Sequence, residues 1–106
     1  MDFTEIRLSG KTRREHDLLG EMEIPAEYYF GVQTMRAVEN FHISRVRLNF
    51  FPELIRALAD VKQGAAMANR DLGLLDKKTA DAIVEACRMV RDGKFDDQFV
   101  VDMVQG

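Results

Sequence analysis

Hydrophobic positions repeat at helical spacing over residues 52–73, the clearest element of the chain. Pro52 suits the first position of a helix, and Gly73 suits the left-handed position just after its end. The apolar row advances in alternating steps of four and three, which makes one continuous seam along the helix. It contains Leu54, Leu58, Val61, Ala65, Ala68 and Leu72. We expect this seam to pack against a helix over 76–92 or a helix over 32–41, with Gly64 permitting a close approach.

A second amphipathic helix is predicted over residues 76–93, from Asp76 as its N-cap to Gly93 as its stop. One face carries Ala80, Ile83, Val84, Cys87 and Val90. The short link between 73 and 76 favours an antiparallel pair with the preceding helix. Cys87 lies on the apolar face, so a buried structural thiol is favoured over a reactive nucleophile.

The first half of the chain has weaker patterns. Residues 5–8 and 18–24 alternate around a turn signal at 9–11, which predicts a short hairpin or extended arm within 1–24. A helix is predicted over 31–41 and an extended segment over 42–50. The fold class is therefore mainly α, with 25–106 as the helical part.

The last eight residues, "FVVDMVQG" (99–106), have the pattern of a buried strand that runs into a glycine turn. Phe99, Val101 and Met103 would share one face. This pattern indicates that the polypeptide continues beyond Gly106.

Composition and charge exclude several classes of function. The net charge of −3 gives no reason to expect a nucleic-acid partner, and we interpret the basic cluster at Lys11, Arg13 and Arg14 as a solvated turn. The sequence has no apolar run long enough to predict a membrane span. A single cysteine fits a reducing compartment, so a cytoplasmic location is expected.

Candidate catalytic and metal-ligating residues are few. His16 and His42 lack the spacing of metal ligands, and "EHD" (15–17) is better explained as surface polarity. "FDDQF" (95–99) is interpreted as an exposed loop rather than a pair of catalytic carboxylates. The residues alone therefore predict a small helical domain with no metal site and no self-contained active site.

One long stretch nevertheless resembles a known family. "DLLGEMEIPAEYYFGVQTMRAVENF" (17–41) is similar to the N-terminal signature of the aspartase/class II fumarase superfamily, and 61–75 and 80–99 resemble the helical segments that follow it. The positions that match the signature are Asp17, Gly20, Ile24, Pro25, Ala26, Gly31, Gln33, Thr34, Arg36, Ala37, Asn40 and Phe41.

Two details resemble the aspartase branch more than the fumarase branch. "DLLGE" (17–21) and "VDMVQG" (101–106) have the aspartase form, whereas fumarases usually carry Met before the glycine and Trp-Gln-Thr near the second motif. Val100 departs from the pattern, because fumarases and some aspartases have proline there.

The resemblance implies a longer enzyme that reversibly converts L-aspartate to fumarate and ammonia, without an organic cofactor, as a homotetramer. Activation by a divalent metal is left open. The family's glycine-rich carboxylate-binding loop, Thr-His pair and serine base would lie beyond Gly106. The chain would then be an inactive N-terminal part, in which Gln33, Thr34 and Arg36 form at most the edge of a site. The alternatives are part of a class II fumarase, or a free-standing helical interaction module without catalysis.

Overall fold

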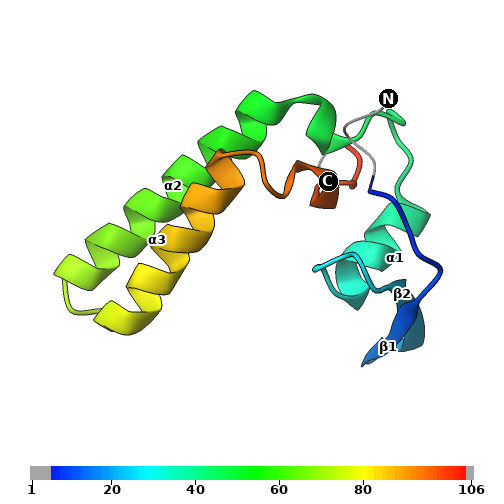
Figure 1. Cartoon of the computed structure of the whole chain (residues 1–106), viewed down its shortest axis with the longest axis horizontal. Helices are drawn as coiled ribbons and strands as arrows, with labels where there is room; N and C mark the ends of the chain where they lie inside the picture. The colour runs from blue at the N-terminus through cyan, green and yellow to red at the C-terminus, as the bar shows by residue number, and fades with distance from the viewer. Residues whose placement is uncertain (1–5, 105–106) are drawn as a thin grey trace. The chain divides into compact units, whose positions relative to one another are not determined.

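The computed structural model describes residues 6–104 and confirms a mainly α fold with an N-terminal hairpin (Figure 1). Its main elements are β1 (Thr12–Asp17), β2 (Gly20–Pro25), α1 (Val32–Asn40), α2 (Pro52–Asp71) and α3 (Lys77–Arg91). The described residues form two compact units. One contains 6–50 and 97–104, and the other contains 51–96.

The hairpin lies later in the sequence than predicted. β1 and β2 are antiparallel, with Thr12 opposite Pro25 and Asp17 opposite Gly20. Residues 6–8 form no strand, so the expected turn at 9–11 is wrong; residue 5 lies outside the described part of the chain. The real turn is stabilised by the Asp17 carboxylate, which accepts a 2.9 Å hydrogen bond from the backbone N–H of Leu19, and by Gly20 at a φ of 125°.

Arg13 is part of the fold, and our interpretation of its neighbourhood as a solvated turn is wrong. It occupies an inward position of β1, and its guanidinium donates hydrogen bonds to the carbonyl oxygens of Tyr28 at 2.6 Å and Phe30 at 2.7 Å. It also pairs with Glu15. The alternation of half-buried and exposed positions in β1 is carried by charged residues, which conceals the strand in a hydrophobicity pattern.

The final described segment is joined to residues 46–49 by backbone hydrogen bonds. The N–H of Leu48 donates to the Val101 carbonyl at 2.9 Å, and the N–H of Met103 donates to the Val46 carbonyl at 2.8 Å. A single antiparallel bridge links Arg47 and Asp102 in place of the predicted strand. The buried positions are Val100 and Asp102, so the predicted inward face of 99, 101 and 103 is wrong. Residues 105–106 lie outside the described part.

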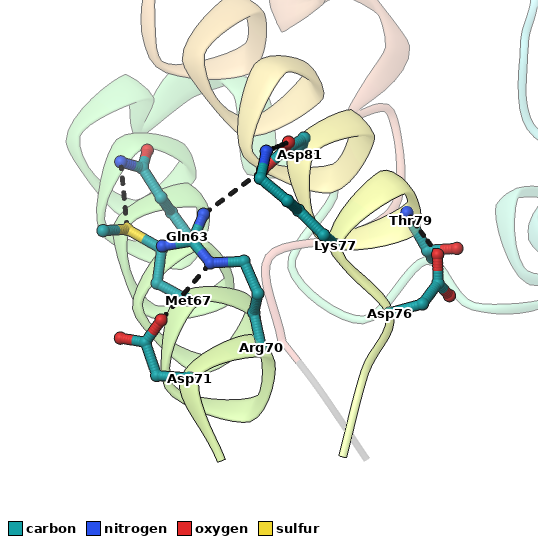
Figure 2. Close-up of polar contacts among 8 residues, drawn as sticks. All are labelled: Gln63, Met67, Arg70, Asp71, Asp76, Lys77, Thr79 and Asp81. Atoms are coloured by element: carbon teal, nitrogen blue, oxygen red, sulfur yellow. Dashed lines mark hydrogen bonds and ion pairs between the residues drawn. The ribbon is translucent and has the colours of Figure 1, made fainter. Parts of the chain in front are cut away.

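The second unit is the predicted antiparallel helix pair, α2 and α3 (Figure 1). Asp76 caps α3 as predicted, because its carboxylate accepts a 3.0 Å hydrogen bond from the backbone N–H of Thr79. The Asp81 carboxylate of α3 forms two ion pairs, both drawn in Figure 2. One is with Lys77 of the same helix, at 2.6 Å, and the other is with Arg70 of α2, at 3.2 Å.

The helices pack through a different face of α2 from the one predicted. Ile55, Ala59 and Ala66 are buried, as are Ala80 and Cys87 of α3. The expected seam is exposed instead: Leu58 is 50% exposed and Val61 is 72% exposed. A Cβ atom on Gly64 would meet no neighbouring atom within 4 Å, so this glycine makes no close approach here.

Small side chains lie on both sides of the contact between α2 and α3. Ala59 and Ala66 let the helices approach each other, as Ala80 and Cys87 do from the other side. The polar residues that border this face also find partners on α3. The Arg91 guanidinium donates 3.0 Å hydrogen bonds to both Asp60 and Gln63 of α2.

Candidate functional site

The turn of the hairpin is attached to α1 by a bidentate ion pair. Arg36 of α1 donates through Nε to one carboxylate oxygen of Asp17 at 3.0 Å and through Nη2 to the other at 2.9 Å. Nη2 also donates to the carbonyl oxygen of Gly20 at 3.1 Å. Both side chains are largely shielded from solvent, with 24% of Arg36 and 16% of Asp17 exposed. This planar, two-point contact fixes the turn relative to the helix.

The electrostatic consequence is that the positive charge of Arg36 is already matched. The Arg36 guanidinium lowers the pKa of the Asp17 carboxyl, and Asp17 in turn raises the pKa of Arg36. Both groups are therefore charged at neutral pH. Arg36 thus acts as a structural anchor, with Nε bound to Asp17 and Nη2 bound to Asp17 and Gly20.

A cavity of about 520 Å³ lies beside this pair. Gln33 and Arg36, two of the three residues suggested as a site edge, line it together with His16 and the turn residues Leu18 and Leu19. Thr34, the third, is half-buried and is not part of its lining. The structure therefore brings Gln33 and Arg36 to one surface. It supplies there an exposed amide and an imidazole but no matched nucleophile and base.

The second polar centre is Asp102, which is only 9% exposed. One carboxylate oxygen accepts the backbone N–H groups of Ser44 at 3.0 Å and Arg45 at 2.8 Å. The other oxygen accepts the Ser44 hydroxyl at 2.8 Å and the backbone N–H of Val104 at 2.9 Å. Four hydrogen bonds thus hold the turn at 44–45 and the end of the described chain to one carboxylate.

These donors keep the carboxylate ionised. The N–H of Val104 lowers the pKa of Asp102 most, and the Ser44 hydroxyl and the N–H groups of Arg45 and Ser44 lower it further, against the opposing effect of burial. A second cavity, of about 450 Å³, lies here, and its lining includes Val38, Arg45, Arg47 and Val100.

Gln98 connects residues 27–29 to the C-terminal segment of the first unit. Its side-chain oxygen accepts the backbone N–H of Tyr29 at 2.7 Å, and its side-chain amide donates to the Glu27 carbonyl at 3.0 Å. The stretch 95–99 is therefore not the plain exposed loop we predicted, because residues 95–99 are all half-buried and 96–98 form a 3₁₀ turn. Gln98 and Arg13 together fix the backbone of residues 27–30.

No group of three His, Cys, Asp or Glu side chains that could hold a metal ion occurs among residues 6–104. Cys87 is buried, as predicted, with 6% of the residue exposed. Within the same described range, every helix is too short or too polar to cross a membrane.

Sequence reasoning missed Arg13, Gln98 and Asp102, which hold the first unit together. Asp102 and Gln98 lie inside stretches whose resemblance to a family is evident, but hydrophobic periodicity assigns no role to a polar residue. For Asp102 the available signal was its setting between Val101 and Met103, because a lone carboxylate within an apolar run usually has a partner.

Comparison with known proteins extends these observations. A model of the family described as Lyase matches residues 20–106. The aspartate ammonia-lyase of Pseudomonas aeruginosa is 55% identical over 97 residues, which cover 92% of this chain and 20% of that protein. The chain spans about a fifth of the length of the curated relatives it matches.

Solved structures show the same relationship. The fumarate lyase:delta crystallin of Brucella melitensis bound to cobalt is 55% identical, with a TM-score of 0.80 over 91% of this chain and 21% of that chain. A recombinant class II fumarase from Schistosoma mansoni is 38% identical, with a TM-score of 0.73 over 86% of this chain and 19% of that chain.

Proposed function

Because this chain belongs to the Lyase family, we propose that it is the N-terminal part of an ammonia-lyase that reversibly converts L-aspartate to fumarate and ammonia. The observation that carries the proposal is the level of identity, about half of all aligned residues, to proteins named aspartate ammonia-lyase. The identity to the class II fumarase is lower, which favours the aspartase reaction over hydration of fumarate.

The reaction requires a base that removes a proton from Cβ of aspartate and an environment that stabilises the resulting carbanion. The charge of that carbanion spreads into the neighbouring carboxylate, where preorganised hydrogen-bond donors lower its energy. In the proposed enzyme a serine base, a Thr-His pair and a glycine-rich loop supply these groups from the polypeptide beyond Gly106. The described residues provide no such constellation, so residues 1–106 alone are proposed to be inactive.

The contribution of this chain is then positional. Asp102 fixes residue 104 and the 44–45 turn through one carboxylate, and the backbone bonds between 46–49 and 99–103 fix the same segment. A loop that follows directly after residue 106 would start from this rigid base. Catalytic groups need such support, because a small displacement of a catalytic group lowers the reaction rate by a large factor.

The remaining features of the proposal come from the same family resemblance. The complete enzyme is proposed to be a cytoplasmic homotetramer that needs no organic cofactor, with activation by a divalent metal as an open question. Gln33, with Arg36 beside it, is proposed to lie at the edge of the site rather than to perform chemistry. Its amide is exposed, whereas the Arg36 charge is matched by Asp17.

The test compares the complete polypeptide encoded by this reading frame with residues 1–106 alone. Fumarate formation from L-aspartate is followed by ultraviolet absorbance, with L-malate as the alternative substrate. We expect turnover of L-aspartate by the complete polypeptide and none by residues 1–106. Turnover of L-malate alone would assign the chain to a fumarase. A reading frame that stops at Gly106, in an inactive protein, would favour a non-catalytic interaction module.

A further inference from the structure

The side of α2 away from its contact with α3 carries an exposed apolar row along the length of the helix. Its exposed seam, here called the α2 seam, contains no charged residue over five turns of helix. The large members are well exposed, with Leu54 at 43%, Leu58 at 50%, and Val61 and Leu72 at 72%. The members of the α2 seam are Leu54, Leu58, Val61, Ala65, Ala68 and Leu72.

Isolated exposed hydrophobic residues are common, but a contiguous row is typical of a surface that is covered by a partner. The steps of four and three match the spacing with which one helix contacts another. Ala65 and Ala68 are small, and Gly64 beside them has open space around it, so a partner helix could approach the backbone closely. The outward face of α3, by contrast, carries Lys78, Glu85 and Arg88, all exposed.

The length of the related proteins indicates where the partner of the α2 seam lies. The curated relatives are about five times as long as this chain, so most of a related polypeptide lies outside the residues seen here. We propose that the α2 seam is the docking surface for an apolar helix from the part of the lyase polypeptide beyond residue 106. This proposal rests on the proposed function in one respect, that the chain is part of a longer lyase.

The burial of the α2 seam can be measured in the complete polypeptide by thiol labelling. Val61→Cys places a thiol on the seam, and Ala82→Cys places one on the exposed outward face of α3 as the matched control. Labelled peptides are identified by mass spectrometry, which separates these sites from Cys87. We expect residue 61 to react at least about tenfold more slowly than residue 82, with the difference lost in denaturant. Ala68→Cys serves as a second seam position if Val61→Cys does not fold.

The alternatives give different results. Equal rates at residues 61 and 82 in the folded polypeptide would overturn the proposal, as would a reading frame that ends at Gly106. Protection that depends on protein concentration in residues 1–106 alone would assign the seam to a second copy of the chain, and would also overturn it. The two proposals fail separately: a protected seam without aspartate turnover refutes only the function, whereas turnover with a labelled seam refutes only the docking.

Discussion

The Asp102 carboxylate accepts a 2.8 Å hydrogen bond from the hydroxyl of Ser44, a residue 58 positions earlier in the chain. The same carboxylate accepts hydrogen bonds from three backbone N–H groups. One side chain therefore connects the two sequence segments of the first unit, 6–50 and 97–104. A charged acceptor that satisfies several partly buried donors contributes to local order, because its loss leaves those donors unpaired.

Asp102→Asn should therefore destabilise the first unit. An amide retains the shape of the carboxylate but replaces one acceptor oxygen by a donor, which then faces the N–H groups it should bind. We expect the urea midpoint of unfolding to fall, and amide hydrogens near residues 44, 45 and 104 to exchange faster. Asp92→Asn is the matched control, because Asp92 is exposed at the end of α3. An unchanged exchange rate at these amides in Asp102→Asn would contradict the assigned role.

Acid should weaken the same contact. The folded-state pKa of Asp102 lies below its ordinary value of about 3.9. Its contribution to stability is therefore complete above that value and is lost as the pH falls through the lower, folded-state pKa. The free energy of unfolding of the wild type should drop in this acidic range, and the Asp102→Asn curve should be shallower there. Parallel curves for the two proteins would show that Asp102 is not responsible for the acid response.

Arg36→Lys should detach the hairpin turn from α1. Lysine keeps the charge but cannot donate two parallel hydrogen bonds to Asp17, as the guanidinium does. Arg14→Lys is a chemically identical control, because Arg14 contacts Glu21 and Glu23 on an exposed surface. We expect faster hydrogen exchange in 17–20 for Arg36→Lys only. Equal effects of the two substitutions would mean that the bidentate geometry has no special value.

The choice between the two apolar faces of α2 can be measured directly. Ile55 is fully buried, so Ile55→Ala should cost about 2–5 kcal/mol of unfolding free energy. Leu58 is half exposed, so Leu58→Ala should cost about 1 kcal/mol or less in this chain. Urea unfolding followed by helical circular dichroism provides both values. A larger loss for Leu58→Ala than for Ile55→Ala would indicate that α2 packs through the face that the sequence predicted.

In residues 1–106 alone, Gly64→Ala should stabilise residues 51–96 by about 1 kcal/mol, because a helix-interior glycine gains from the substitution and nothing lies within 4 Å of the new methyl group. Gly73→Ala should instead lower the free energy of unfolding. Gly73 has a φ of 75°, where an alanine is strained by about 1–2 kcal/mol. Thermal unfolding of both variants, with the wild type alongside, tests the pair. A destabilised Gly64→Ala would show that the position is covered.

Long periodic segments were predictable from the sequence, and contacts made by single polar residues were not. The α1, α2 and α3 helices and the Asp76 cap follow from spacing and local chemistry. The choice of packing face in α2 does not, because α3 covers the face with Ile55, Ala59 and Ala66 rather than the longer apolar row that the spacing indicates. β1 was missed since its inward positions carry charged residues, and their partners, such as the carbonyls that bind Arg13, are distant in sequence.

Gln33 and Arg36 line one cavity, and Thr34 is not part of its lining. Hydrophobic periodicity could not reveal that the charge of Arg36 is matched in an ion pair, because its partner Asp17 lies 19 positions earlier and on another element. The family signature contains both residues, but neither hydrophobic periodicity nor local spacing indicates that they form an ion pair.

The turn at Ser44 and Arg45 also determines how freely the sequence can vary there. Arg45 has a left-handed backbone with a φ of 61°, and its shape is imposed by Asp102 through backbone N–H groups that every residue except proline possesses. In a saturation library selected for folding, position 45 should therefore accept many residues, with glycine and asparagine enriched and proline and β-branched residues depleted. Position 102 should accept little besides aspartate. Mutational tolerance at this turn is thus unequal: the residue with the unusual backbone is replaceable, and the acceptor on the opposite segment is not.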